Sequence, residues 1–261
     1  MAVTAIGWRA HAALRASGGK IEVIARLSSS VYARAAGELI WIGPPGTPLH
    51  GRSVAVSEAP VGASWRLTVD GVAPWRPPAI SGAADRVTAA RILGDTITAL
   101  GEPRGLCRLT GEDLVTSRAR PHVLAVARAC AADDAVAFAE AARPLLGLGT
   151  GLTPSGDDFV GGALFARRIV PTRDGDAWNA TAAHIVAEAA TLTHEISARL
   201  LGDLANGEGW APLHDLAHGL ADGEPARALS AARELTALGH TSGWDILAGF
   251  SIGLAAGPSP G

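Results

Sequence analysis

The sequence predicts an α+β fold, with a β-rich N-terminal part (residues 1–78) followed by a mostly α-helical C-terminal part (residues 79–261). Between Lys20 and Trp75, short runs of β-branched and aromatic residues are separated by Gly, Pro and Ser turns. After the proline-rich segment APWRPPAISG, alanine and leucine recur at helical spacing. This change in periodicity predicts the boundary between the two parts.

The individual elements follow from the same patterns. The expected strands are KIEVIARL, VYARA, ELIWIG, SVAVSE and SWRLTVDG. Ile185, Leu192 and Leu200 belong to one apolar stripe, so we expect a single long helix there that ends before Gly207. The expected helices are 83–100, 121–131, 133–143, 177–206, one from Pro212 and one from Pro225 to Gly239.

Composition excludes several classes of function. The formal net charge is −3 and no basic block is present, so we expect no nucleic-acid partner. No apolar run reaches the ~20 residues of a membrane span, and we expect no membrane partner. Cys107 and Cys130 are too few and too far apart for a disulfide framework, which suits a soluble cytoplasmic protein. The single lysine, Lys20, excludes a nucleotide-binding phosphate loop.

One short stretch is unusually polar and rich in glycine. Residues 147–162 read GLGTGLTPSGDDFVGG, with six glycines, a proline and two adjacent aspartates. TPSGDDFVGGAL (residues 153–164, the first copy) aligns with HTSGWDILAGFS (residues 240–251, the second copy), 87 residues further along. Each copy has a hydroxyl, a glycine, one variable residue, an aspartate and then an apolar helix. The sequence therefore predicts a repeated loop-into-helix motif.

Such a motif suits the binding of a small anion. The first N–H groups of a helix have no internal partner and carry the positive end of the helix dipole, and a glycine lets a ligand approach the backbone. The alternative is helix capping, with Ser155 and Ser242 as caps and the aspartates three residues later as their partners. Capping does not explain the doubled acid, Asp157 and Asp158, which we place in an exposed loop.

Small residues predict how the two copies meet. Gly162 and Ala166 in the first copy's helix, and Gly249 and Gly253 in the second's, lie four residues apart and allow two helix backbones to approach closely. If these faces pack together, both helix N-termini point at one pocket. The alternative is ordinary alanine-rich packing.

Other polar groups give weaker signals. His214 and His218 lie one helical turn apart, a spacing that suits a metal, but no third ligand is evident. Thr193 and Ser197 share a face of the expected long helix, where they either line the pocket or bond to their own backbone. His240 opens the second copy, where its imidazole can donate to an anion or exchange a proton.

The motifs GLGTGLTPSGDDFVGG, THEISARLL and LGHTSGWDILAGFSIGL, in this order, resemble the AllH-like family associated with oxamate carbamoyltransferase. The resemblance extends from about Pro144 to Leu254. It implies a subunit of a multi-subunit enzyme of purine and allantoin breakdown, in which oxalurate and phosphate give oxamate and carbamoyl phosphate. It also implies other transferase subunits as partners.

The residues and the resemblance together define the candidate site. The candidate catalytic residues, which move protons or hold a magnesium-bound phosphate, are Asp157, Asp158, His240 and Asp245. The candidate substrate-binding residues are Gly149, Gly151, Thr153, Ser155, Gly156, Thr241, Ser242, Gly243, Thr193 and Ser197. No cofactor is required by the pattern, and a role for Mg²⁺ stays open.

Two features keep a second hypothesis open. Neither copy contains the arginine or lysine expected at a carbamoyl-phosphate site, so a basic residue from elsewhere in the chain or from a partner is needed. The alternative function is a non-catalytic subunit that binds a small anion or acts as a scaffold. The doubled acid favours the catalytic hypothesis, because an anion-binding nest has little use for carboxylates beside its ligand.

Overall fold

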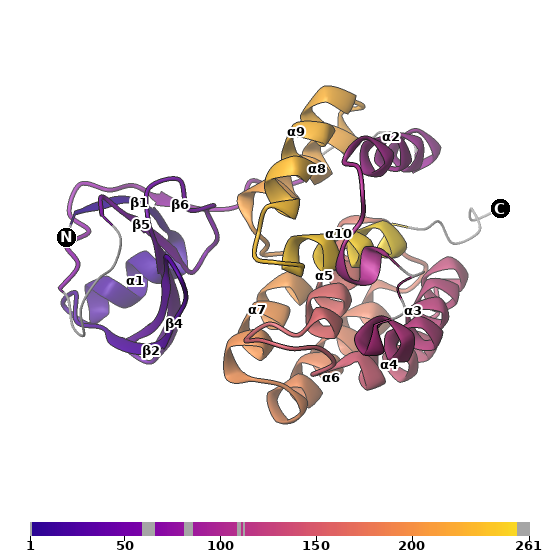
Figure 1. Ribbon diagram of the computed structural model, residues 1–261, viewed down its shortest axis with the longest axis horizontal. Coiled ribbons are helices and arrows are strands. Elements are labelled where there is room, and N and C mark those ends of the chain that lie inside the picture. Colours follow the sequence, from indigo (N-terminus) through magenta and orange to yellow (C-terminus); the bar gives the residue numbers. More distant parts are fainter. Residues whose placement is uncertain (1, 59–65, 81–85, 109–110, 112, 255–261) are drawn as a thin grey trace. The chain divides into compact units, whose positions relative to one another are not determined.

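The computed structural model describes residues 2–58, 66–80, 86–108, 111 and 113–254. Over these residues the fold is α+β, as predicted, with a mixed sheet preceding a helical region (Figure 1). The chain forms two compact units. Unit 1 comprises Met1–Ala79 and Gly209–His214, and unit 2 comprises Ile80–Glu208 and Asp215–Gly261.

Unit 1 is built on one sheet, whose strand order is β2-β3-β4-β5-β1-β6 over the described residues. β1 is parallel to β6 and β4 is parallel to β5, whereas the other neighbours are antiparallel. Helix α1 (Trp8–Ala16) contacts β1, β3 and β4 and completes an apolar core. The strands are β1 (Val3–Gly7), β2 (Glu22–Arg26), β3 (Val31–Ala35), β4 (Glu38–Gly43), β5 (Ser53–Val56) and β6 (Pro74–Trp75).

Three details of unit 1 differ from the sequence prediction. β1 and α1 come before the first predicted strand, and β6 lies in the segment predicted to be a breaker. Proline is tolerated in β6 because this short strand is at the edge of the sheet. The predicted strand SWRLTVDG forms only isolated bridges, at Arg66 and Thr68, and its first two residues lie outside the described ranges.

A short segment from late in the chain completes unit 1. The N–H of Ala211 donates to the carbonyl oxygen of Leu49 at 2.7 Å. The ring of Trp210 lies 4.7 Å from that of His50, measured between centroids. Residues 209–214 therefore pack with the sheet unit although they follow most of the helical region in sequence.

The helical region is organised around α5 (Ser155–Ile169), whose side chains are buried along most of its length. α5 contacts α6, α7 and α10. No helix in the described ranges is both long enough and apolar enough to span a bilayer. The remaining elements are α2 (Arg86–Ala99), η1 (Gly105–Cys107), α3 (Leu114–Ala132), α4 (Ala135–Ala142), η2 (Arg143–Leu145), α6 (Gly175–Leu192), α7 (Glu195–Ala205), α8 (Ala211–Ala221), α9 (Pro225–Thr236) and α10 (Ser242–Gly253).

The predicted long helix over 177–206 is wrong, because the chain breaks between α6 and α7. Thr193 has an extended backbone, with φ −135° and ψ −177°, and His194 precedes the first turn of α7. The apolar stripe continues across this break, so the periodicity alone indicated one helix. The hydroxyl of Thr193 instead donates to the carboxylate of Asp157 in α5, and this tertiary contact accompanies the break.

The predicted helix 121–131 begins earlier than expected, at Leu114. Asp113 caps it by accepting a hydrogen bond from the N–H of Thr116 at 2.9 Å. Pro121 therefore lies inside the helix instead of opening it. The signal was ambiguous because proline also favours the first turn of a helix.

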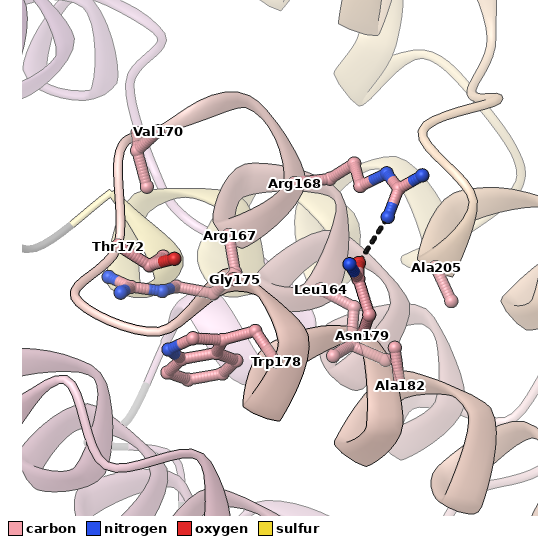
Figure 2. Close-up of a pocket in the computed structure, with 10 residues that line it drawn as sticks. All are labelled: Leu164, Arg167, Arg168, Val170, Thr172, Gly175, Trp178, Asn179, Ala182 and Ala205. Atoms are coloured by element: carbon pink, nitrogen blue, oxygen red, sulfur yellow. Dashed lines mark hydrogen bonds between the residues drawn. The ribbon is translucent and has the colours of Figure 1, made fainter.

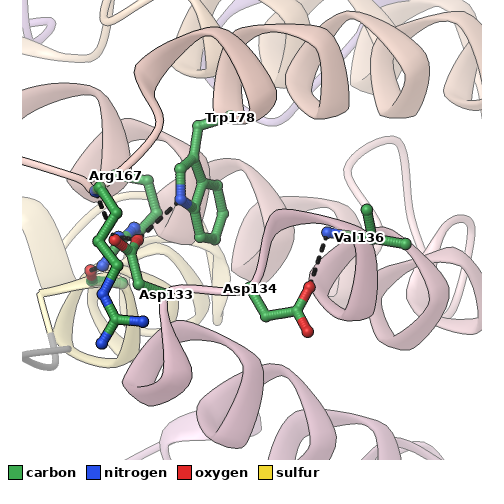
Figure 3. A network of polar contacts seen from close by, with 7 residues as sticks. Asp133, Asp134, Val136, Arg167 and Trp178 are labelled. Atoms are coloured by element: carbon green, nitrogen blue, oxygen red, sulfur yellow. Dashed lines mark hydrogen bonds and ion pairs between the residues drawn. The ribbon is translucent and has the colours of Figure 1, made fainter. Parts of the chain in front are cut away.

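The predicted helix 133–143 begins at Ala135, because Asp133 and Asp134 have other roles. Asp134 caps α4 by accepting from the N–H of Val136 at 3.1 Å. Asp133 has a left-handed backbone, with φ 53°, at the end of α3. Figure 3 shows both residues on the short connection between the two helices.

Asp133 connects three helices through a buried polar network (Figure 3). Its carboxylate forms an ion pair with Arg167 in the last turn of α5 and accepts from the indole N–H of Trp178 in α6 at 2.8 Å. The guanidinium of Arg167 lies 4.4 Å from the ring centre of Trp178. Breaking such a buried pair leaves an uncompensated charge, so this network fixes the C-terminal end of α5.

Candidate functional site

The helices of the two copies, α5 and α10, pack backbone against backbone (Figure 1). A Cβ atom at Gly162 would clash with the carbonyl oxygen of Ile246, and one at Gly249 would clash with that of Phe159. Gly249 and Ile246 lie 87 residues after Gly162 and Phe159 respectively, so each copy makes the same contact on the other. The predicted close approach is confirmed, and the pair has an internal two-fold relation.

The loops that precede α5 and α10 also meet. The hydroxyl oxygens of Thr153 and Ser242 are 3.0 Å apart, and those of Ser155 and Thr241 are 3.5 Å apart. Ser155 and Ser242 are the first residues inside the helices and not the cap positions before them, and their hydroxyls contact the other copy. The geometry therefore does not support the capping alternative, and the hydroxyls of the two copies face each other.

Gly156 and Gly243 have a packing role. A Cβ at Gly156 would clash with the carbonyl oxygen of Leu145, and one at Gly243 would clash with that of Leu235. The space beside each glycine is thus filled by protein backbone. Our expectation that these glycines open a path to a ligand is not supported by this geometry.

Gly149 and Gly151 shape the loop of the first copy. Their φ angles are +136° and +91°, in a region that side-chain-bearing residues rarely adopt. A Cβ at Gly149 would lie 2.6 Å from the backbone nitrogen of Ser155, so the loop folds tightly onto the start of α5. These two glycines position the loop that carries Thr153.

Asp157 is a buried carboxylate that connects α5 with α7 and with the loop at Gly147. Its side chain is in the first turn of α5 and the residue is 1% exposed, so the prediction of an exposed loop carboxylate is wrong. The carboxylate accepts from the N–H of Gly147 at 2.8 Å and from the hydroxyl of Ser197 at 2.7 Å. The hydroxyl of Thr193 also donates to it. Thr193 and Ser197 therefore hold α7 to α5 through Asp157.

Asp158 is a buried carboxyl with an unusual environment. The residue is 4% exposed, and its Oδ2 atom has no hydrogen-bond partner among the described residues. Burial, followed by the negative charge of Asp245, raises the pKa of Asp158 well above its ordinary range. The hydroxyls of Ser242 and Thr153 oppose this rise. Asp158 is therefore expected to hold a proton at a pH where most aspartates are ionised.

Asp245, the counterpart of Asp158, is fully buried, and its Oδ2 also lacks a partner among the described residues. Its Oδ1 accepts from the N–H of Leu106 in η1 at 2.6 Å. Burial raises the pKa of Asp245 to about 6, against the opposing effect of that N–H and of the hydroxyls of Ser155 and Thr241. A carboxyl with this pKa can exchange a proton near neutral pH.

A large pocket is lined in part by residues of the second copy, His240, Thr241 and Trp244. Its volume is about 1090 Å³. Gly105 is part of its wall, and the same glycine lies against Oδ1 of Asp245, so Asp245 is just behind that wall. Residues of the first copy do not contribute to the lining. The polar and aromatic side chains among the lining residues are those of Glu102, Arg104, Arg108, Asp113, Arg233, Thr236, His240, Thr241 and Trp244.

The sequence argument identified His240 and Thr241 but missed the arginines and Trp244. Arg104 and Arg108 belong to EPRGLCRL, where a proline and a glycine between two helical segments mark an irregular stretch. Arg233 is in the last turn of α9. Trp244 occupies the variable position of the second copy, where the first copy has Asp157. This difference between the two copies was the signal in the sequence that could have identified Trp244.

His214 is buried, and its Nε2 accepts from the N–H of Gly209 at 3.1 Å. This nitrogen is already used within the protein. Among the described residues, no group of three or more His, Cys, Asp or Glu side chains is arranged to hold a metal.

A second, smaller pocket of about 190 Å³ lies near the C-terminal end of α5 (Figure 2). Arg168 and Asn179 form a hydrogen bond beside it, and Trp178 forms part of its lining. None of the residues predicted for the site lines this pocket. Residues near the C-terminal end of α5 therefore line the smaller pocket, whereas the large pocket is lined by no residue of α5.

The repeated loop-and-helix motif carries two buried carboxyls, and one of them, Asp245, lies against the wall of a large pocket. A pocket with a few convergent polar groups beside it is typical of a small-molecule site. Residues 145–254 match the family model of the oxamate carbamoyltransferase subunit AllH, which confirms the resemblance predicted for this segment. No solved structure matches the chain.

Proposed function

We propose that this chain is a subunit of an oxamate carbamoyltransferase-like enzyme that converts oxalurate and phosphate to oxamate and carbamoyl phosphate. The family match supports the class of enzyme. The observation that carries the catalytic part is the buried carboxyl of Asp245, which lies against Gly105 in the wall of the large pocket and has the buried Asp158 as its neighbour.

The reaction needs one proton to move. A phosphate oxygen attacks the carbamoyl carbon of oxalurate, and the bond from that carbon to the oxamate nitrogen breaks. Phosphate loses a proton and the departing nitrogen gains one, so charge and atoms balance without another reactant. We assign the relay of this proton to Asp245, because its pKa is raised to about 6 and it lies against Gly105 in the pocket wall, with Asp158 as its buried neighbour.

The other predicted residues have supporting roles in this proposal. The hydroxyls of Thr153, Ser155, Thr241 and Ser242 connect the two copies and surround the carboxyls. His240 is exposed at the pocket and is the candidate for contact with the anionic substrate. Asp157 positions the first turn of α5.

The decisive experiment is reconstitution with the partner subunits. We expect no carbamoyl phosphate from the isolated chain and turnover from the mixture. Asp245→Asn in the mixture should lower kcat by at least about 100-fold, the scale of a lost acid–base group. Asp95→Asn, an exposed control in α2, should leave kcat unchanged.

Two outcomes would contradict the catalytic proposal. Full turnover by the isolated chain would remove the need for partner subunits. Full turnover by the mixture containing Asp245→Asn would favour the non-catalytic alternative, in which this chain binds a small anion or acts as a scaffold.

A further inference from the structure

The large pocket contains more basic groups than the reaction proposal uses. Arg104 and Arg233 line it, and neither pairs with a carboxylate in the described part of the chain. Arg108 lies 3.5 Å from Glu102, but both side chains are largely exposed, at 56% and 80%, so this ion pair is weak. The pocket thus presents guanidinium groups that are available to a ligand.

The acidic residues on the lining do not cancel this charge. Glu102 is the exposed partner of Arg108. Asp113 also lines the pocket, and its Oδ1 accepts from the N–H of Thr116 as the cap of α3. Arginine recognises carboxylate and phosphate with paired N–H donors, and nothing else in the described lining has this geometry.

The interior behind the pocket is unsuitable for an anion. The starts of α5 and α10 already carry the carboxyl groups of Asp157, Asp158 and Asp245 within their first turns. These groups occupy the positions at which a helix dipole would favour an anion. We therefore expect the small anion predicted from the repeated motif to bind in the large pocket, beside its arginines, and not between the first turns of α5 and α10.

We propose that Arg104 and Arg233, supported by Arg108, form an oxyanion-binding subsite for a carboxylate or phosphate group. The inference rests on the proposed function for the choice of ligands, which are its substrates and products. The arginines come from two regions that are distant in sequence, the segment around η1 and the last turn of α9, and both line the pocket that His240 and Thr241 also line.

The pocket is larger than a single small anion. Its volume of about 1090 Å³ is slightly above the roughly 300–1,000 Å³ that is usual for small-molecule sites. A phosphate or an oxamate ion fills only a fraction of this space. The pocket can therefore hold donor and acceptor together, with one anionic group on the arginines and the reacting atoms nearer to Asp245.

The test is direct binding to the purified full-length chain. Inorganic phosphate and oxamate are titrated separately by calorimetry at low salt, because exposed charge interactions are screened by salt. We expect saturable binding of at least one anion. Arg233→Gln and Arg104→Gln should each weaken it at least about tenfold, as expected for a lost hydrogen bond to a charged group.

Two comparisons keep the test sharp. Arg128→Gln is the matched control, because Arg128 is exposed in α3 and does not line the pocket, and it should leave affinity unchanged. Arg233→Lys keeps the positive charge but lacks the planar guanidinium. Its anion affinity should lie between that of the unmodified chain and that of Arg233→Gln. Circular dichroism of each variant checks that the fold is retained.

The outcomes of the binding and activity measurements distinguish a failure of the anion-binding inference from a failure of the proposed function. Arginine-dependent binding of phosphate identifies a phosphate subsite, and arginine-dependent binding of oxamate identifies a carboxylate subsite. Absence of binding by either anion, or equal affinity in the glutamine variants, would overturn the inference. If arginine-dependent binding is found but the assembled enzyme forms no carbamoyl phosphate, the proposed function fails and the subsite stands.

Discussion

The two copies of the repeated motif share a backbone arrangement but differ in what surrounds it. Gly162 and Gly249 make equivalent contacts, and Asp158 and Asp245 are equivalent buried carboxyls. The copies diverge at one aligned position. There the first copy has Asp157, which is held by three donors, and the second has Trp244, which lines the large pocket.

The two copies therefore differ in their surroundings. The first copy is closed by polar contacts to α7 and to the loop at Gly147, so it has a structural role. Residues of the second copy line the large pocket, where the proposed subsite is located. Two copies with identical surroundings would not differ in this way. The following predictions test whether the two copies differ.

Disrupting the helix crossing should have the largest effect. Gly249→Ala places a Cβ against the carbonyl oxygen of Phe159 and 2.9 Å from the backbone nitrogen of Ala163, and neither backbone atom can move freely. We expect the free energy of unfolding to fall by about 4 kcal/mol or more. Gly94→Ala in α2 meets open space and should be neutral or slightly stabilising. Urea unfolding of both variants measures this contrast, and equal stability would contradict the reciprocal contact.

Asparagine substitutions should distinguish the two adjacent aspartates. Asp157→Asn loses charge-assisted hydrogen bonds to buried donors and should reduce stability by about 3 kcal/mol. Asp158→Asn should leave stability at pH 7 unchanged or increased, because it replaces a carboxyl for which the charged form is unfavourable. Thermal and urea unfolding at one pH provide the comparison. The assignment of Asp157 as the structural residue would be wrong if the two variants exchanged these effects.

The raised pKa values predict how stability depends on pH. Asp245 ionises near 3.8 in the unfolded chain but at about 6 in the folded one, so the folded chain binds more protons between these values. The contribution of Asp245 to the free energy of unfolding therefore decreases as pH rises from about 4 to above 6, by less than about 3 kcal/mol. Asp158 contributes in the same direction.

The asparagine variants measure this effect. Relative to the unmodified chain, Asp245→Asn should gain stability as pH rises from 4 to 7 and show no such gain below pH 4. Unfolding curves at a series of pH values check the sign. A relative loss of stability above pH 6 would mean that the charged form of Asp245 is favoured in the folded chain.

The smallest expected effect concerns a thiol beside the second copy. Burial, followed by the negative charge of Asp245, raises the pKa of Cys107 to about 11. Asp245→Asn should speed alkylation of Cys107 at pH 8 by about threefold, because the thiolate is the reactive form. Cys130, with a pKa raised to about 12 by burial, is the internal control. Mass spectrometry of the alkylated native protein separates the two rates, and equal acceleration at both thiols would indicate general loosening of the fold.

The sequence predicted the division of the fold and the pairing of the two copies, because both depend on local patterns. Strand-like runs and helical periodicity differ in composition, and Gly162 and Gly249 stand at equivalent positions of an aligned repeat. It did not predict the break at Thr193. There the apolar stripe continues along the chain, whereas the extended backbone accompanies a contact with Asp157 that periodicity does not encode.

The pocket was beyond sequence reasoning for a related physical reason. Arg104 and Arg233 are far apart in the chain and belong to no shared motif, so only the packing of the helices brings them to one cavity. The burial of Asp157 and Asp158 was also hidden, because a glycine-rich stretch with two acids is typical of an exposed loop. In the structure, both acids belong to the first turn of a central helix.

Buried polar contacts hold helix α5 at both of its ends. Asp157 fixes its first turn to α7, and Arg167 fixes its last turn to Asp133 at the end of α3. Sliding along the helix axis would require both buried contacts to release together. Displacement of α5 along its own axis is therefore expected to cost more than displacement of an element that is held at one end only.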